Sequence, residues 1–286
     1  MISMTVITSA LELGFIYALV ALALFLSFRI LNIADMTTDG SFTLGCAVSA
    51  TVALAGYPFL ALPAAMLAGA CAGIITALLQ TKWGVPSILA GIITNTGLYT
   101  VNLAVMGFSS NLNMLKATTI FAAFPGMKLI PAVIITVFVA ATLVVFLNTR
   151  LGLSIRATGD NPDMVRASSI NTGLTVTIGL AISNAITALS GAVLAQYQKT
   201  ADISLGTGMV IIGLASLIIG ETIFRGRKIW VKALGAVVGC IAYRFIIAIA
   251  LRLDLPSECL KLVSAIIVAI AIALPAIKSR KGGKAI

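Results

Sequence analysis

The sequence predicts an all-α integral membrane protein, a polytopic bundle of about nine transmembrane helices that forms a single domain over residues 1–286. Hydrophobic residues make up 60% of the chain and charged residues 10%, whereas a soluble domain has about 45–50% and about 25%. The mean hydropathy is +1.12. Nine mostly apolar runs follow one another, each of the ~17–25 residues that cross a bilayer as a helix.

The candidate spans cover residues 6–28, 38–56, 59–80, 86–106, 129–148, 173–197, 205–223, 229–251 and 258–277. The first has no Lys or Arg before Arg29, so it lacks the basic region of a cleaved signal peptide, and we expect it to be retained. The segment 205–223 begins among Ser, Gly and Thr residues. It is either a full span or a short helix that re-enters the membrane. The outer connection 107–128 is long enough to carry a short surface helix.

Basic residues are distributed unevenly between the two sides of these spans. The net charge is +10, from 19 Lys and Arg against 9 Asp and Glu. Thirteen of the 19 fall on one side, five on the other, and Arg244 lies within a span. The positive-inside rule predicts a cell (inner or plasma) membrane protein with its N-terminus outside and the tail 278–286 in the cytoplasm, where the tail contacts anionic lipid. Because no aromatic residues interleave with these charges, nucleic-acid binding is disfavoured.

The composition also excludes several kinds of chemistry. The chain has no histidine, which removes the Ser–His–Asp triad, the Cys–His dyad and His-ligated metal sites. Its four cysteines form no CxxC pair, so neither a disulfide framework nor zinc is indicated. The spans contain no paired carboxylates for acid–base catalysis. We therefore expect no enzyme activity, metal or cofactor in this chain.

The cytoplasmic connection 149–172 is the most polar stretch of the sequence. Gly159 is expected to end the preceding segment, and Asp160 or Asn161 to cap a new helix that starts at Pro162 and ends near Ser169. A helix this short does not span the membrane. Held between two spans, it is suited to dock into a groove on a partner, although an ordinary solvated loop is the simpler alternative.

This loop resembles the coupling loop of ABC importer permeases, within the subfamily that includes branched-chain amino acid and ribose permeases. The matching residues are Gly152, Arg156, Ala157, Gly159, Asn161, Ala167, Ile170 and Asn171. Ser169 departs from the glycine that the family often has there. The polar stretch from Thr38 to Gly45 is similar to the family's entry to a central helix. Within the family, the chain is most similar to permeases of uncharacterised and tryptophan/tyrosine-type import systems.

The resemblance implies a permease subunit of an ATP-driven importer for a small solute, with an amino acid expected and a sugar or nucleoside left open. It implies a permease homodimer, an external solute-binding protein and two ATPase subunits. ATP would be bound by those subunits, because this chain has no GxxxxGK[ST] motif. Contact with the ATPase is expected from Arg156, Gly159, Asn161, Pro162, Met164, Val165, Arg166 and Ala167. A secondary transporter or channel is the alternative, but it usually shows coupling carboxylates at mid-membrane, and these are nearly absent from the predicted spans.

Polar residues inside the spans are the candidates for a translocation path. Asn95, Tyr99 and Asn102 recur at helical spacing, so they form one stripe. Asp35 and Asp39 are interpreted first as N-caps of the second span, and alternatively Asp39, Gly40 and Ser41 line an inner gate. Asn184, beside Ser183, is a weaker candidate for the path. Hydrogen bonding between helices is the alternative role for all of these amides and hydroxyls.

Two charged residues are candidates for an intramembrane ion pair. Glu12 lies in the outer third of the first span, and Arg244 lies well inside the eighth. They are placed to form an ion pair, or else Arg244 pairs toward Asp254 or Glu258. The small-residue pairs Gly69/Gly73 and Gly235/Gly239 are expected to pack helices within one subunit rather than to form a dimer seam.

Overall fold

The computed structural model describes residues 4–123, 126–224, 226 and 228–252, and the regular elements of this part are helices and two three-residue strands. The elements are α1 Met4–Leu24, η1 Phe25–Ile30, α2 Thr38–Leu54, α3 Ala61–Thr81, α4 Ser87–Val105, β1 Asn111–Asn113, η2 Ile120–Ala123, α5 Leu129–Leu147, α6 Arg150–Asp160, α7 Pro162–Ala167, α8 Thr172–Gln198, β2 Thr200–Asp202, α9 Met209–Ile223 and α10 Ile229–Arg252. η1 is a π-helical continuation of α1, and η2 is a 3-10 turn in the outer connection. The predicted helical membrane class is confirmed.

Six helices of the described part are long and apolar enough to cross a membrane: α1 with η1, α3, α4, α5, α8 and α10. Helix α2 has 17 residues and α9 has 15, so both are short for a span. The segment predicted at 205–223 is helical only from Met209, which favours the short-helix alternative. The candidate span 258–277 and the tail 278–286 lie outside the described residues, so the count of nine stays a prediction.

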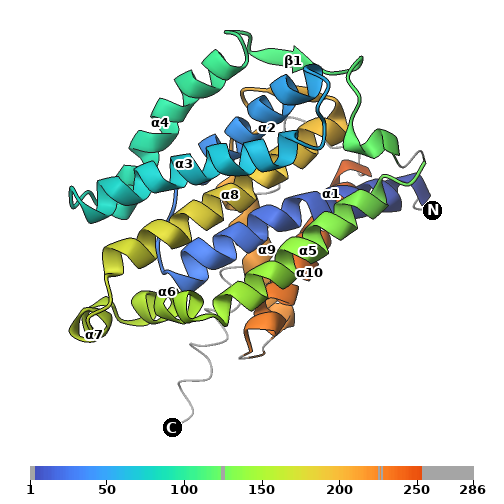
Figure 1. The fold of residues 1–286 in the computed structure, drawn as a ribbon. Helices are drawn as coiled ribbons and strands as arrows, with labels where there is room; N and C mark the ends of the chain where they lie inside the picture. The colour runs from blue at the N-terminus through green and yellow to red at the C-terminus, as the bar shows by residue number, and fades with distance from the viewer. Residues whose placement is uncertain (1–3, 124–125, 225, 227, 253–286) are drawn as a thin grey trace.

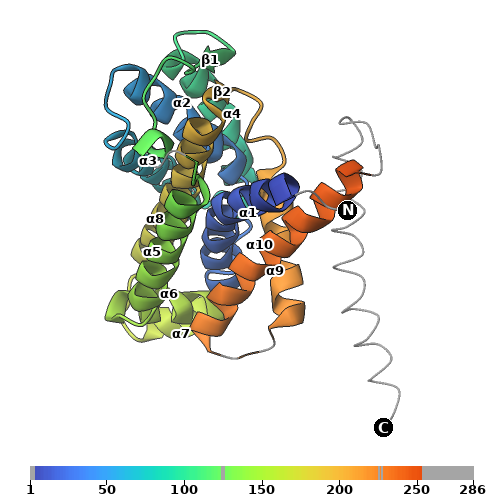
Figure 2. The same ribbon diagram turned by 90° about the vertical axis from the view of Figure 1, so that its right-hand side faces the viewer.

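Helix α8 is the centre of the bundle. Its apolar window is 83% buried, against 22% for α5. Figure 1 shows α8 between α3 and α1, with α2 behind it, and Figure 2 shows α9 and α10 grouped on the other side of α1. The apolar residues of α1 are enclosed almost completely, because α5, α8, α9 and α10 all pack on that helix.

Glycine allows α2 and α8 to touch backbone to backbone. A Cβ at Gly45 would overlap the carbonyl oxygen of Ala188, and one at Gly191 would overlap that of Phe42. A thiol of α2 reinforces the contact, since Cys46 Sγ donates to the Gly191 carbonyl oxygen at 3.2 Å. Close approach through small residues is the usual means of helix association in membranes. The expected pairs behave alike: Gly69 and Gly73 pack on α8, and Gly235 and Gly239 pack on α9, all within one subunit.

The bundle has two distinct ends. At one end, β1 pairs antiparallel with β2, near the start of α1 (Figure 1). At the other end lie α6, α7 and an ion pair of 2.7 Å between Arg29 of η1 and Glu221 of α9. We name these the β1–β2 end and the α6–α7 end. Of the basic residues predicted to be cytoplasmic, Arg29, Arg150, Arg156 and Arg166 belong to η1, α6 and α7 at the α6–α7 end. Six others lie outside the described residues: Arg225, Arg227, Lys278, Arg280, Lys281 and Lys284.

The polar connection 149–172 is more ordered than the sequence predicted. Gly159 does not end a segment, because α6 continues through it to Asp160. The absence of a side chain there serves packing instead: a Cβ would overlap the carbonyl oxygen of Ile30. The second half of the prediction is confirmed, since Asn161 caps α7 by accepting from the backbone N–H groups of Asp163 and Met164, with Pro162 in the first turn.

The α2–α8 contact predicts a clear difference between two glycines. Gly45→Ala should lower the free energy of unfolding by about 1–3 kcal/mol, because the added methyl group forces the two backbones apart. Gly97→Ala is the matched control, since nothing lies within 4 Å of its Cβ position, and it should be neutral or stabilising. Thermal unfolding of the detergent-purified chain checks both. Equal melting temperatures for the two variants would contradict the contact.

Candidate functional site

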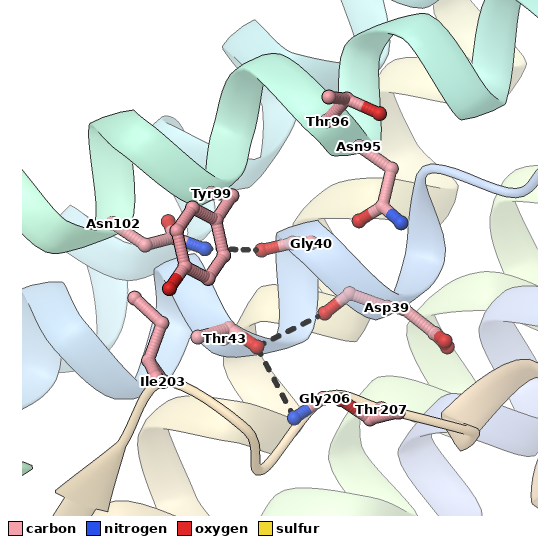
Figure 3. Close-up of a pocket in the computed structure, with 10 residues that line it drawn as sticks. All are labelled: Asp39, Gly40, Thr43, Asn95, Thr96, Tyr99, Asn102, Ile203, Gly206 and Thr207. Atoms are coloured by element: carbon pink, nitrogen blue, oxygen red, sulfur yellow. Dashed lines mark hydrogen bonds between the residues drawn. The ribbon is translucent and has the colours of Figure 1, made fainter. Parts of the chain in front are cut away.

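A polar pocket of about 340 Å³ lies between the start of α2, the exposed stripe of α4 and the non-helical segment that precedes α9 (Figure 3). Its lining consists of Asp39, Gly40, Thr43, Asn95, Thr96, Tyr99, Asn102, Ile203, Gly206 and Thr207. Five of the seven residues that the sequence proposed for a path therefore meet here. They are Asp39, Gly40, Asn95, Tyr99 and Asn102.

Helix α4 supplies one wall of the pocket. Asn95, Tyr99 and Asn102 are three and four residues apart, so the helical period brings them to one face, and the predicted stripe is present (Figure 3). Tyr99 is 56% exposed, whereas Asn102 is 2% exposed. The Asn102 Nδ2 donates to the carbonyl oxygen of Gly40 at 3.2 Å, and its Oδ1 is buried without a hydrogen-bond partner. One polar atom at the pocket is thus left unsatisfied.

Asp39 joins α2 to α9. Its two carboxylate oxygens accept from the backbone N–H groups of Gly208 and Val210, each at 2.9 Å. These donors belong to the first turn of α9, which has no partner for them within the helix. From the sequence, we interpreted Asp39 first as an N-cap of its own helix, α2. The structure corrects this interpretation, because Asp39 caps α9 instead. Gly208 has φ +87°, a conformation that only glycine adopts readily, so the turn into α9 depends on it.

The segment 203–208 is held at both sides. Asp202 of β2 accepts from the backbone N–H of Ser204 at 2.8 Å and from the Ser204 hydroxyl. These bonds hold the pKa of the Asp202 carboxyl below its usual range, because they stabilise the charged form. Further along, the backbone N–H of Gly206 donates to Thr43 Oγ1 at 3.1 Å. The pocket wall is therefore an anchored loop.

Ser41 and Asn184, the other two proposed path residues, do not line the pocket. Ser41 Oγ donates to Asn184 Oδ1 at 2.7 Å, and Asn184 Nδ2 donates to Asp35 Oδ2 at 2.7 Å. All three side chains are buried. The structure therefore favours the alternative in which these groups join helices. Asp35 also accepts from the Thr37 backbone N–H just before α2 begins, but Thr37 is the N-cap residue of α2, so the predicted N-cap role of Asp35 is wrong.

The same network places a carboxylate deeper than the sequence indicated. Asn184 is twelve residues from the first residue of α8, which is about 18 Å along the axis. Asp35, bonded to it, is consequently near the middle of the bundle rather than at its inner edge. The scarcity of carboxylates at mid-membrane, used above against a secondary transporter, is thus weaker than the sequence suggested.

Glu12 and Arg244 do not pair in the structure. Glu12 Oε2 accepts a hydrogen bond from the Tyr197 hydroxyl at 2.7 Å. The guanidinium carbon of Arg244 lies 3.6 Å from the ring centroid of Tyr17, a cation–π geometry. The predicted ion pair is wrong, because Arg244 lies over Tyr17, five residues further along α1 than Glu12. The alternative partners Asp254 and Glu258 lie outside the described residues.

The residues proposed for coupling lie together at the α6–α7 end (Figure 1). Val165 is 2% exposed and anchors α7, whereas Met164 is 65% exposed and projects from it. Val165 thus faces its own subunit, unlike Met164 and Ala167. Arg166 is held by bonds of 3.2 Å to Thr172 and 3.4 Å to Asp163. Arg156 lies on α6 and is partly buried.

Five pocket residues were not proposed from the sequence: Thr43, Thr96, Ile203, Gly206 and Thr207. Thr96 follows Asn95 on α4, and Thr43 lies one turn after Asp39, so helical spacing from the chosen residues signals both. The other three belong to the Ser- and Gly-rich start of the segment 205–223 or adjoin it. That composition indicated a break in the helix, but no local pattern showed which side chains the break would face.

Comparison with known proteins identifies the family. Residues 6–274 match the model of the branched-chain amino acid transport system / permease component family. The chain belongs to this family. Among similar members, a tyrosine transport system permease protein of Clostridioides difficile is 34% identical over 93% of this chain and 90% of its own length. The uncharacterized protein RP368 of Rickettsia prowazekii is 33% identical over 94% and 97%. The ribose import permease protein RbsC of Haemophilus influenzae is 23% identical over 83% and 75%.

The Glu12–Tyr197 bond predicts the outcome of a double-mutant cycle on this permease. Glu12→Leu and Tyr197→Phe should show a coupling energy of about 1 kcal/mol, because each change removes one partner of the same hydrogen bond. Tyr197→Phe keeps the ring that packs on Phe121. Glu12→Leu with Arg244→Met is the control pair, and its effects should add. Unfolding in detergent measures both cycles, and coupling in the second pair alone would restore the ion pair.

Proposed function

We propose that this permease is the membrane-spanning subunit of an ATP-driven importer for a small solute. The polar pocket at membrane depth is the observation that carries the proposal. A pocket lined by a carboxylate, two amides and four hydroxyl groups is costly in a lipid-embedded bundle unless it serves passage. Family membership supports transport, and ATP hydrolysis is assigned to separate subunits.

Helix α7 is the proposed contact with the ATPase. It projects from the α6–α7 end, with Met164 and Ala167 exposed and Val165 packed inward. Helix α6 forms the base on which α7 rests: its buried face comprises Gly152, Ile155 and Thr158, and Thr158 shares a 2.9 Å hydrogen bond with Thr175 of α8. A small projection on a well-packed base fits a groove in a partner and passes on its movement as a rigid body.

A second permease subunit is proposed to face the pocket. Thr96, Tyr99 and Thr100 of α4 are exposed along a membrane helix, and the pocket lies on that side. Lipid offers these hydroxyl groups no hydrogen-bond partner beyond their own helix, where Thr96 donates to the carbonyl oxygen of Ile92, so a protein surface is the better neighbour. A homodimer is the simplest arrangement, with the translocation path between the copies. An external solute-binding protein would deliver the solute at the β1–β2 end, which we assign to the outside.

An amino acid is the proposed solute. The relative named for tyrosine transport is more similar to this chain than the one named for ribose import, at 34% against 23% identity. The alternative, a secondary transporter or channel, is favoured by one observation, the buried carboxylate of Asp35 at mid-bundle. ATP dependence of uptake separates the two. Vesicles that contain the permease with its ATPase and binding protein should accumulate L-tyrosine only with ATP.

The docking proposal predicts which changes in α7 uncouple transport. Ala167→Glu should abolish uptake and reduce co-purification of the ATPase, because it places a charge on the docking surface of α7 without touching the spans. Arg166→Ala is the matched control on the same helix and should have a small effect, since this arginine is exposed and bonded within its own loop. Full ATPase association and full uptake in Ala167→Glu would exclude α7 as the coupling helix.

The proposed orientation predicts opposite labelling of the two ends. In a background with Cys46, Cys71, Cys240 and Cys259 replaced by alanine, Ser110→Cys at the β1–β2 end should react with a membrane-impermeant maleimide on intact cells. Ser168→Cys at the end of α7 should react only after the membrane is opened. Both serines are exposed, so access to the reagent is set by the side of the membrane. The reverse pattern would contradict the orientation.

A further inference from the structure

Three side chains of the pocket keep unused hydrogen-bonding groups that a ligand can reach. Asn95 is partly exposed, and Tyr99 and Thr207 are exposed. Among the described residues, the structure gives none of these three side chains a hydrogen-bond partner. The carboxamide of Asn95 offers two N–H donors and an acceptor oxygen, and each hydroxyl group offers one donor and two lone pairs. The accessible groups of the pocket are therefore neutral, and they include donors and acceptors alike.

Other polar groups of the lining are already committed or closed to a ligand. The Thr43 and Thr96 hydroxyls each donate to a carbonyl oxygen of their own helix, at 3.2 and 2.8 Å, which leaves only their lone pairs for a ligand. Asn102 Nδ2 donates to the Gly40 carbonyl oxygen, and Asn102 Oδ1 has almost no exposed surface, so a ligand does not reach it. Of the two side-chain amides in the lining, only that of Asn95 is open to a ligand.

Asn95 is positioned by packing rather than by a hydrogen bond. Figure 3 shows its side chain directed from α4 toward the first turn of α2. A Cβ added at Gly40 would lie 2.5 Å from Asn95 Oδ1 and 3.0 Å from a methyl carbon of Leu98, so the amide occupies space that only glycine leaves free. An amide that is packed in place while its hydrogen-bonding groups stay unpaired is suited to bind a ligand, because no internal bond must break first.

The charge on the lining indicates what kind of head group the pocket accepts. Asp39 is the only acidic residue among the ten lining residues, and none of them is Lys or Arg. Its two carboxylate oxygens accept the N–H groups of Gly208 and Val210, so its charge faces the positive end of α9. An anionic head group would find no cation on the lining, and an ammonium group alone would leave the donors of Asn95 and Thr207 unpaired. A head group of zero net charge that brings donors and acceptors avoids both costs.

We infer that Asn95 binds a solute head group of zero net charge that carries both hydrogen-bond donors and acceptors, with the Tyr99 and Thr207 hydroxyls as further neutral partners in the pocket. In the proposed importer of an amino acid, this head group is the ammonium and carboxylate pair of the zwitterion, and Asn95 Nδ2 donates to the carboxylate. A sugar carries the same combination of groups on its hydroxyls, so L-tyrosine and D-ribose are compared. The inference rests on the proposed function, because the solute must enter this pocket.

Direct binding to the full-length permease in lipid nanodiscs tests the inference without transport. At neutral pH the probes are L-tyrosine, tyramine, which lacks the carboxylate, 3-(4-hydroxyphenyl)propionate, which lacks the amine, and D-ribose. Titrations followed by saturation-transfer NMR give a dissociation constant for each. We expect L-tyrosine to bind at least about tenfold more tightly than tyramine and the propionate, because among these three only the zwitterion brings donors and acceptors at zero net charge.

Variants at two positions separate recognition from packing. Asn95→Leu removes the amide and Asn95→Gln keeps it, so the first should weaken L-tyrosine binding by about tenfold or more and the second by much less. Gly40→Ala leaves Asn95 in the chain but fills the space under its amide, and it should also weaken binding. Gly97→Ala, on the same helix as Asn95, is the matched control and should bind normally, since nothing lies within 4 Å of its Cβ position. Melting temperatures confirm that each protein is folded.

Three results would overturn the assignment to Asn95: L-tyrosine that binds no more tightly than tyramine or the propionate, undiminished binding in Asn95→Leu, or no saturable binding of either L-tyrosine or D-ribose. Binding of D-ribose alone that is lost in Asn95→Leu would support Asn95 and overturn the amino acid as the solute. The importer proposal fails separately, if uptake by the assembled complex proceeds without ATP. The two experiments therefore distinguish a wrong binding residue from a wrong function.

Discussion

The direct backbone contact between α2 and α8 is the constraint on which the candidate site depends. Gly45 and Gly191 bring the two helices together at distances that no side chain would permit, and Ser41 and Cys46 bond across the seam. Helix α2 is thereby fixed against the most buried helix of the bundle. Its first turn, with Asp39 and Thr43, is consequently held beside α4 and the segment 203–208, where the pocket forms.

Helices that begin inside the bundle create a second requirement, since backbone groups at membrane depth must find partners within the protein. The start of α2 is satisfied by Asp35, and the start of α9 by Asp39. Both carboxylates thus have a structural role, as acceptors for backbone N–H groups, that explains their presence without a ligand. Asn102 differs from them, because its Oδ1 is buried without a hydrogen-bond partner.

Hydropathy and the helical repeat of the sequence predicted the helices well, but they predicted the contacts between helices poorly. Apolar length places most spans, and spacing alone places Asn95, Tyr99 and Asn102 on one face. The predicted partner of Glu12 was wrong, because the true partner depends on how α1, α8 and α10 are rotated about their axes. No local sequence pattern encodes that rotation. Gly159 was misread for a related reason: a glycine that breaks a helix and a glycine that admits a neighbouring carbonyl look identical in sequence.

The proposed docking helix and the pocket are joined by an unbroken series of contacts. Helix α7 follows α6 directly, and Gly159 of α6 packs on the carbonyl of Ile30 in η1. Arg29, the preceding residue, forms an ion pair with Glu221 near one end of α9. At the other end of α9, the backbone bonds to Asp39 at the pocket. Because α9 is a single short helix tied at both ends, a displacement of α6 against η1 has a rigid route to the pocket wall. Coupling between distant sites requires such physically contiguous elements.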